Sequence, residues 1–211
     1  MTGSEARAPF ITFEGIDGAG KTTQLEALCH FLQSRGTPFE RTREPGGTPA
    51  GERLREVVLA EAMQPETELL VMFAARCEHV QARILPAITA GRWVVCDRFS
   101  DASYAYQVGG RGVDAARFAL IERWVLGGFR PDLTFLFDLD PAVAGRRLAQ
   151  AGTRVRDRFE RLDQAFFARV RAAYLERAAR EPGRFVVLDA TRPPEALSQQ
   201  VIAEVQRRWP S

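Results

Sequence analysis

Short runs rich in β-branched and aromatic residues alternate along the chain with longer segments whose apolar residues recur at helical spacing. The short runs, which predict strands, are residues 10–14, 39–43, 93–97, 133–138 and 185–189. Helical periodicity covers residues 21–35, 49–60, 66–90, 114–126, 141–149, 162–180 and 194–208. Strands that alternate with helices predict the α/β class, with a five-stranded parallel sheet flanked by helices on both faces.

The size and composition of the chain are those of one ordinary globular domain. It has 211 residues, of which 45% are hydrophobic and 27% are charged. We expect a short N-terminal extension over residues 1–9 and a single domain over residues 10–211. No apolar run approaches the about 20 residues of a membrane-spanning helix, and the first nine residues lack the apolar core of a secretory signal. The sequence therefore predicts a cytoplasmic protein that is not embedded in a membrane.

Cysteine and histidine are sparse and widely spaced. Cys29, Cys77 and Cys96 form no Cys-x-x-Cys pair, which argues against both a structural disulfide and a zinc cluster. His30 and His79 have no partners at metal-ligand spacing. We expect both histidines to be structural or solvated.

A glycine-rich segment follows the first predicted strand directly. Residues 15–22 match the pattern G-x-x-x-x-G-K-[ST], between the strand and the helix that this pattern requires. Its small residues let successive backbone N–H groups surround phosphate oxygens, and the start of the helix adds a favourable dipole. The sequence thus predicts a P-loop NTPase fold, with ATP-binding positions at Gly15, Ile16, Asp17, Gly18, Ala19, Gly20, Lys21 and Thr22.

Two cations and two metal ligands are predicted around this loop. Lys21, the only lysine in the chain, is the expected catalytic cation at the β- and γ-phosphates. Thr22 and Asp97, which lie at the start of a helix and at the end of a strand, are the expected ligands of Mg²⁺. Arg98 places a second catalytic cation opposite the loop. This arrangement suits a small kinase whose acceptor carries its own phosphate.

Several other classes of nucleotide-binding protein share the phosphate loop. A Ras-like GTPase is excluded, because the chain has no asparagine and no second lysine for an Asn-Lys-x-Asp element. A motor ATPase usually has a strand that ends in Asp-Glu, whereas the candidate strand here ends in Asp97-Arg98. A formal net charge of +2 gives no reason to expect nucleic acid as a partner. A P-loop kinase for another acceptor and a regulatory ATP-binding module without turnover remain as alternatives.

Positive charge is concentrated in residues 146–161, which hold six arginines against two carboxylates. Such a run is often a solvated helix face. Phosphoryl transfer, however, requires guanidinium groups that reach the charge on the transferring group once both substrates are in place. We therefore expect an arginine-rich lid over residues 146–161 that closes on the donor and excludes water. Its expected catalytic arginines are Arg154, Arg156 and Arg158.

Seven segments, taken in order, resemble the motifs of bacterial thymidylate kinases. They are residues 13–23, 42–48, 73–76, 97–99, 105–107, 130–134 and 157–160. The Arg-Glu-Pro-Gly-Gly and Asp-Arg-Phe segments are more specific than the phosphate loop, and the likeness extends from about Phe10 to the C-terminus. The resemblance implies transfer of the γ-phosphoryl group of ATP to dTMP, which gives dTDP for dTTP synthesis, by a homodimer that uses Mg²⁺.

The resemblance also implies which residues contact the sugar and phosphate of dTMP. Asp17 is expected to meet the 3′-hydroxyl, and Arg98 and Arg55 to bind the phosphate. Arg76 is expected to contact O4 of thymine. Glu44, after the second strand, is expected near the acceptor phosphate and the metal.

A further set of residues is implied around the base. Ser103 and Gln107 are expected to orient it, and Tyr106 to lie against the sugar where a 2′-hydroxyl would clash. Relatives commonly stack an aromatic residue on thymine, four residues before the base-reading arginine; here that position is Met72, with Phe73 beside it. Both lie on the same helix face as the arginine. We expect Phe73 to take the stacking role, with a place in the hydrophobic core as its alternative.

The phosphate loop also indicates a subtype. Gly18 stands where some relatives place an arginine. The chain therefore resembles the thymidylate kinases that keep their catalytic arginines in the lid. This agrees with the charge count made from the residues alone.

Overall fold

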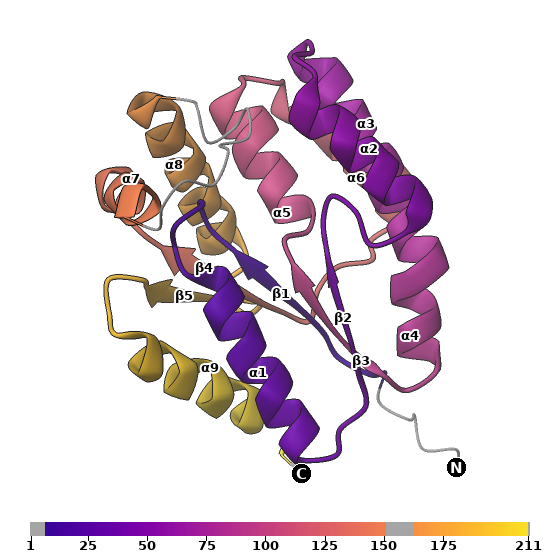
Figure 1. Ribbon diagram of the computed structural model, residues 1–211. Coiled ribbons are helices and arrows are strands. Elements are labelled where there is room, and N and C mark those ends of the chain that lie inside the picture. The colour runs from indigo at the N-terminus through magenta and orange to yellow at the C-terminus, as the bar shows by residue number, and fades with distance from the viewer. Residues whose placement is uncertain (1–6, 151–162, 211) are drawn as a thin grey trace.

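Five parallel strands form the central sheet of the computed structural model, which describes residues 7–150 and 163–210 (Figure 1). In chain order they are β1 (Phe10–Glu14), β2 (Phe39–Arg43), β3 (Trp93–Asp97), β4 (Leu133–Asp138) and β5 (Phe185–Asp189). Their order across the sheet is β2-β3-β1-β4-β5, and every pairing between neighbours is parallel. The predicted strands and the five-stranded parallel sheet are confirmed.

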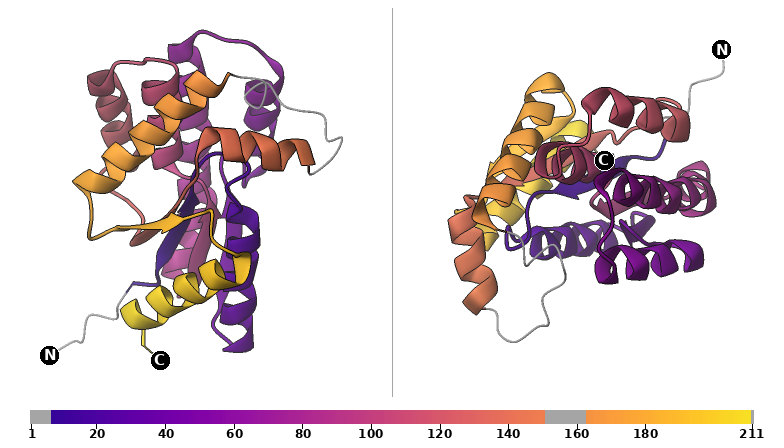
Figure 2. Two further views of the ribbon diagram at one scale, coloured as in Figure 1. Left: turned by 90° about the vertical axis from the view of Figure 1, so that its left-hand side faces the viewer. Right: turned by 90° about the horizontal axis from the view of Figure 1, so that it is seen from above.

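Helices pack on both faces of this sheet. On one face, α1 (Lys21–Ser34) lies beside α9 (Pro194–Arg208); α4 (Leu85–Thr89) and α8 (Gln164–Arg180) pack on the other (Figure 2). The other α-helices are α2 (Pro49–Ala60), α3 (Pro65–His79), α5 (Ser100–Ser103), α6 (Ala115–Leu126) and α7 (Pro141–Gln150).

The hydrophobic core explains why β1 is the central strand. All five of its residues are buried, because helices cover it on both sides. Ile11 and Phe13 pack in the core cluster that contains the apolar side of α1, whereas Phe10 packs in the cluster that contains Phe99 and residues of α4. This burial holds the glycine-rich loop at the carboxyl edge of the sheet, where ligands bind in folds of this kind.

The long helix predicted over residues 66–90 is not uniform. It runs as α3, then a π-helical turn η1 (Val80–Ile84), then α4. Pro86 lies in the first turn of α4, and it has no N–H to donate to the carbonyl four residues earlier. The wider turn of η1 immediately before it accommodates this missing hydrogen bond.

The structure adds helical segments that sequence periodicity did not predict. Residues 100–110 form α5 and the π-helical segment η2 (Tyr104–Gly110), which packs along α8. A Cβ at Gly109 would lie 2.4 Å from the Cβ of Ala173, and one at Gly110 would lie 2.5 Å from the Phe166 ring. These glycines allow the close packing, yet glycine is a poor helix former and so conceals the segment in the sequence.

Several sequence predictions lie outside the described residues or are not tested by the fold. Arg154, Arg156 and Arg158, which carry the predicted lid chemistry, lie outside the described residues. The boundary between an extension over residues 1–9 and a domain over residues 10–211 stays a prediction. Across residues 7–150 and 163–210, no helix has both the length and the apolar character needed to span a bilayer.

Candidate active site

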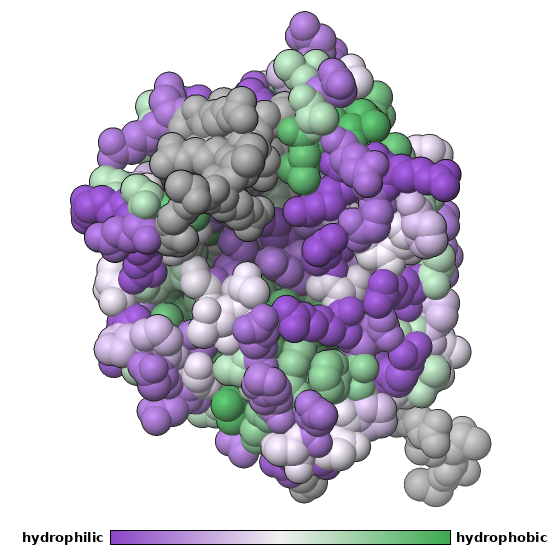
Figure 3. All heavy atoms as spheres, in the orientation of Figure 1, coloured by the Kyte–Doolittle hydropathy of each residue, from purple (hydrophilic) through white to green (hydrophobic). Residues whose placement is uncertain are grey.

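A cleft of about 890 Å³ opens at the carboxyl edge of the sheet, beside the ends of β1, β2 and β3. Hydrophilic side chains gather across the middle of this face, where the surface is hollowed (Figure 3). The cleft brings together eleven of the residues predicted for the site, which are Asp17, Gly18, Gly20, Lys21, Thr22, Glu44, Arg55, Asp97, Arg98, Tyr106 and Gln107.

The donor side of the cleft is the loop between β1 and α1. Gly15 adopts a φ of 135°, and a Cβ there would lie 2.6 Å from the carbonyl oxygen of Phe137. Only glycine accommodates both the backbone angle and this approach. In the described part of the chain no side chain caps α1, so its first N–H groups are available to an anion.

Lys21 is held at this loop by the backbone and by one carboxylate. Its Nζ donates to the carbonyl oxygen of Ile16 at 3.1 Å and lies 3.7 Å from Asp17 Oδ1. Burial lowers the pKa of Lys21, and the charge of Arg98 lowers it further, whereas Asp17 opposes both. The lysine is only 6% exposed. Its charge is therefore poorly screened by water and can act strongly on a bound phosphate.

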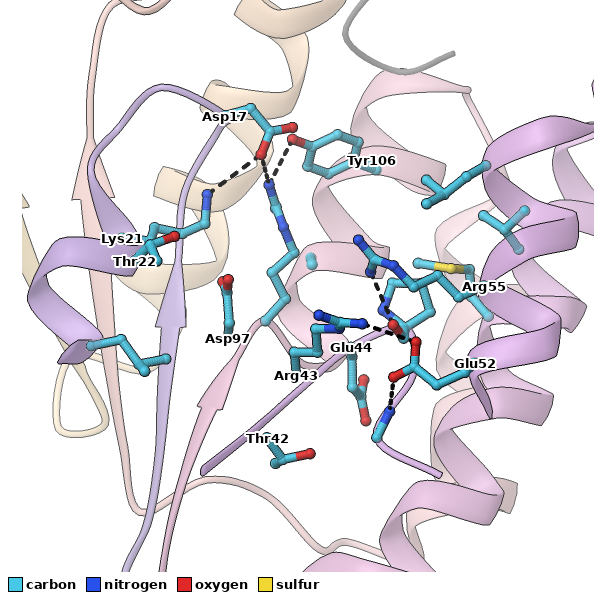
Figure 4. A pocket seen from close by; sticks show the side chains of 18 of the residues that line it. Asp17, Lys21, Thr22, Thr42, Arg43, Glu44, Glu52, Arg55, Asp97 and Tyr106 are labelled. Atoms are coloured by element: carbon cyan, nitrogen blue, oxygen red, sulfur yellow. Dashed lines mark hydrogen bonds and ion pairs between the residues drawn. The ribbon is translucent and has the colours of Figure 1, made fainter. Parts of the chain in front are cut away.

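Arg98 follows directly after β3 and lines the same cleft, in which Asp17 lies between Lys21 and Tyr106 (Figure 4). Its guanidinium donates to Asp17 Oδ1 at 2.7 Å and to the Tyr106 hydroxyl at 3.3 Å, and it lies over the Tyr106 ring. The backbone of Arg98 has a φ of 69°, a left-handed conformation that residues with a Cβ seldom adopt. Asp17 thus stands between two of the cations that line the cleft, Lys21 and Arg98.

Asp97 and Thr22 provide oxygen atoms on the cleft wall. Asp97 Oδ1 is buried and has no hydrogen-bond partner among the described residues, and Thr22 is exposed at the start of α1. Mg²⁺ takes oxygen ligands and usually keeps several waters and substrate phosphates in its coordination shell. One carboxylate and one hydroxyl therefore fit an ion of this kind.

Arg76 lies in a buried layer behind the cleft wall and is only 1% exposed. Its Nε donates to Glu44 Oε2 at 2.7 Å, and its Nη2 donates to the carbonyl oxygen of Phe99 and to Ser103 Oγ, each at 3.0 Å. Within residues 7–150 and 163–210, its Nη1 is buried without a hydrogen-bond partner. The network fixes the orientation of the guanidinium and leaves one nitrogen for a further acceptor.

His79 completes this layer, and sequence analysis did not assign it to the site. It is fully buried, with Nδ1 2.9 Å from Glu44 Oε1 and Nε2 2.6 Å from Thr42 Oγ1. His79 is therefore a structural residue, which is the first of the two alternatives that the sequence predicted. Glu44 and His79 are 35 residues apart, and no local pattern in the sequence connects them.

Ser103 and Phe73 lie away from the cleft wall. Ser103 is fully buried behind Arg76, which donates to it. Phe73 is 2% exposed; its ring packs 5.5 Å from that of Phe118 and lies beneath the Arg76 guanidinium. Met72, the neighbouring residue, lines the cleft instead. The structure thus places Phe73 in the core position that was its alternative.

Gln107 does reach the cleft. Its Nε2 donates to Glu68 Oε1 at 2.9 Å, and its Oε1 is buried with no hydrogen-bond partner in the described ranges. Arg76 Nη1 and Gln107 Oε1 are thus a buried donor and a buried acceptor that have no hydrogen-bond partner among the described residues. A ligand with an adjacent acceptor and donor would complement them.

Comparison with known proteins decides the family. The thymidylate kinase family model matches residues 13–201. The chain belongs to the thymidylate kinase family. It is 54% identical over 200 residues to the thymidylate kinase of Bordetella pertussis, with 95% of each chain covered. The thymidylate kinase of Burkholderia cenocepacia is 53% identical over 200 residues, which cover 93% of this chain and 96% of the relative.

A solved structure agrees with this membership of the thymidylate kinase family. The crystal structure of thymidylate kinase from Ehrlichia chaffeensis matches with a TM-score of 0.77 and 32% identity, covering 95% of this chain and 99% of that chain. The P-loop fold, the enzyme class and the reaction predicted from the sequence, which is phosphorylation of dTMP to dTDP, are confirmed. The roles of individual residues, the metal and the homodimer stay predictions.

Proposed function

We propose that the cleft transfers the γ-phosphoryl group of ATP in line to the phosphate of dTMP, with the donor on the glycine-rich loop and the acceptor beside Arg98. One observation supports this division of the cleft into a donor side and an acceptor side. Asp17 Oδ1 lies 2.7 Å from Arg98 and 3.7 Å from Lys21, so one carboxylate lies between a cation at the start of α1 and a cation that follows β3. Each cation can then bind a different phosphate without losing its counter-charge.

On the donor side, the N–H groups at the start of α1 bind the phosphates and Lys21 stabilises negative charge on the β- and γ-oxygens. Thr22 and Asp97 would hold Mg²⁺, which when bound neutralises charge between these two phosphates. Arg154, Arg156 and Arg158, in the predicted lid, would stabilise charge on the transferring group.

On the acceptor side, Arg98 and Arg55 bind the phosphate of dTMP. Arg55 lines the cleft from α2, where its Nη1 donates to the carbonyl oxygen of Pro45 at 3.0 Å. Asp17 accepts from the 3′-hydroxyl, and the ring of Tyr106 forms the wall beside the sugar. Glu44 acts mainly by holding Arg76, because both of its carboxylate oxygens have buried partners.

The base is read by Arg76 Nη1 and Gln107 Oε1. Thymine presents an acceptor at O4 and a donor at N3, which complement this donor and acceptor. Cytosine presents the reverse pattern, so it would leave both protein atoms facing a like group. Met72 contacts the face of the base, because it lines the cleft where Phe73 does not. Discrimination against cytosine is therefore expected to be stronger than discrimination against uracil.

The homodimer is proposed to form through α3 and α6, which pack against each other. Trp124 is 85% exposed, and Leu120, four residues earlier, shares its face of α6. Leu70 is exposed on α3. An apolar surface of this kind suits a second copy of the chain. Sedimentation of Trp124→Arg should show monomers where the unmodified chain shows dimers, and two identical profiles would refute this surface.

A coupled assay of ATP consumption across dTMP, dUMP, dCMP, UMP and thymidine tests the proposed function. We expect dTMP to be the best acceptor, dUMP a poor one, and dCMP and thymidine at the background measured with Lys21→Ala. Thymidine as the best acceptor would favour a nucleoside kinase, and dCMP equal to dTMP would refute the base-reading pair. ATP binding without turnover of any acceptor would favour a regulatory module.

A further inference from the structure

A buried chain of hydrogen bonds runs from the end of β1 through α8 to Arg98. Glu14 is fully buried and Tyr174 is 1% exposed. Arg98 Nη1 donates to the Tyr174 hydroxyl at 3.1 Å, and that hydroxyl lies 2.9 Å from Glu14 Oε2. Neither Glu14 nor Tyr174 lines the cleft, and the phosphoryl transfer proposed above assigns no role to either residue.

The other oxygen of the Glu14 carboxyl holds the backbone next to Arg98. Glu14 Oε1 accepts from the backbone N–H of Phe99 at 2.7 Å, and the N–H of Arg98 itself donates to the carbonyl oxygen of Phe13 at 3.0 Å. The left-handed backbone of Arg98 is unfavourable for a residue with a Cβ, and it persists only where its surroundings hold it firmly. Glu14 therefore restrains Arg98 twice, through the backbone and through Tyr174.

The Tyr174 hydroxyl is the link between this restraint and the guanidinium. Burial raises the pKa of Glu14 to about 8, and the charge of Asp101 raises it further. A charged Glu14 accepts from Tyr174, whereas a protonated Glu14 would donate to it. In either case the hydroxyl still accepts from Arg98. A phenylalanine ring would fill the same space and could do neither.

Three oxygen atoms from three parts of the chain determine where the guanidinium points. They are Asp17 Oδ1 of the phosphate loop, the Tyr106 hydroxyl of η2 and the Tyr174 hydroxyl of α8. The first two belong to residues that line the cleft, where a bound acceptor can compete for them. Tyr174 lies behind the cleft wall, so its hydrogen bond to Arg98 can persist when the acceptor is bound.

We propose that Tyr174, supported by Glu14, is a positioning residue that orients the Arg98 guanidinium towards the acceptor phosphate. The inference rests on the proposed function, in which Arg98 binds that phosphate. It predicts that loss of the Tyr174 hydroxyl weakens recognition of the phosphate and leaves recognition of the nucleoside unchanged. It also predicts that the donor side, which Tyr174 does not contact, is unaffected.

The test compares Tyr174→Phe with a matched control, Tyr104→Phe. Like Tyr174, Tyr104 is buried and its hydroxyl bonds to a glutamate, which here is Glu176 of α8 at 3.4 Å. Unlike Tyr174, it does not contact Arg98. Calorimetry would measure the Kd of dTMP and of thymidine for each variant, and steady-state kinetics would measure kcat and both KM values. For Tyr174→Phe we expect about tenfold weaker dTMP binding and a similar fall in kcat/KM for dTMP. Thymidine binding, the KM for ATP and the control should stay within about twofold of the unmodified protein.

Glu14→Met gives a second variant should Tyr174→Phe not fold, because it keeps about the length of the side chain but has no oxygen or N–H to bond to the Tyr174 hydroxyl. The same selective loss of dTMP affinity is expected. Equal weakening of dTMP and thymidine, or unchanged dTMP binding, would overturn the positioning role while leaving the proposed function intact. If the unmodified protein itself binds thymidine as tightly as dTMP, then the proposed function fails, and the inference fails with it.

Discussion

The donor and acceptor halves of the cleft are built on different principles. The donor half is one contiguous segment, residues 15–22, in which glycines and backbone N–H groups form the binding surface. The acceptor half consists of side chains that hold one another across long sequence separations, such as Glu44 with Arg76 and Tyr174 with Arg98. The comparison indicates that the donor half depends on its own residues, whereas the acceptor half depends on partners that never touch the substrate.

The largest expected effect is that of removing Lys21, the one cationic side chain of the donor half. Lys21→Ala removes a buried cation from the β- and γ-phosphates, so turnover should fall by at least about 10² and ATP affinity by less. Lys21→Arg should fail as well, because a planar guanidinium does not fit where a compact ammonium donates to Ile16. Steady-state kinetics with dTMP as acceptor measures both. More than a tenth of the original turnover in Lys21→Ala would show that the loop is not catalytic.

The donor half and the strands were the parts that sequence could predict, because their signals are local. Every predicted strand has the bounds seen in the structure, and the loop pattern lies within eight consecutive residues. The acceptor half was reached mainly through family resemblance. His79 and Tyr174 were missed, because their partners lie 35 and 76 residues away and no periodicity records such pairs.

The positions of Met72, which lines the cleft, and Phe73, which is in the core, show a second limit of sequence patterns. Helical spacing places both residues on the face of Arg76, and it cannot decide which one meets the ligand. Packing decides instead: Phe118 on α6 covers the ring of Phe73 and leaves Met72 at the cleft. The decision depends on a helix more than 40 residues further along the chain.

The next largest effect is expected at Arg76, the most buried cation of the acceptor half. Arg76→Lys keeps the charge but cannot reproduce the donors that reach Glu44, Phe99 and Ser103. A lost hydrogen bond to a charged group is worth about 1.5–3 kcal/mol, so kcat/KM for dTMP should fall roughly ten- to hundredfold. The KM for ATP should stay close to its original value. An equal loss for both substrates would contradict the separation of the two halves.

The next prediction concerns how the free energy of unfolding depends on pH through Glu14, which adjoins both halves of the cleft. Burial raises the pKa of Glu14 to about 8 from an ordinary value of 4.5. Between these values the folded protein binds a proton that the unfolded chain does not, so this group's contribution to stability decreases as pH rises from about 4.5 to 8. Each full proton changes the free energy of unfolding by at most about 1.4 kcal/mol per pH unit.

Glu14→Gln removes this titration. Urea unfolding at several pH values from 5.5 to 7.5 should therefore show a steeper loss of stability with rising pH in the unmodified protein than in the variant. Glu204 provides the control, because hydrogen bonds from Arg207 and Arg208 lower its pKa to about 2 and its charge does not act on Glu14. Glu204→Gln should not flatten the curve in this range. Parallel curves for Glu14→Gln and the unmodified protein would show that Glu14 is ionised when folded.

The smallest expected effect concerns the choice of sugar at Tyr106. A 2′-hydroxyl against the buried ring would lose water without gaining a partner, at about 1–3 kcal/mol, whereas the 5-methyl of thymine contributes about 1–3 kcal/mol at most. UMP should therefore be a worse acceptor than dUMP.

Tyr106→Ala should narrow the gap in kcat/KM between dUMP and UMP several-fold, because it removes the ring that forms the wall beside the sugar. Tyr106→Phe keeps the ring and should keep the gap, but it removes a hydroxyl that Arg98 contacts at 3.3 Å, so it should weaken both nucleotides by a similar factor. Ratios of kcat/KM for the two acceptors measure the gap in each variant. A gap that Tyr106→Phe closes as fully as Tyr106→Ala would assign the sugar discrimination to the hydroxyl rather than to the ring.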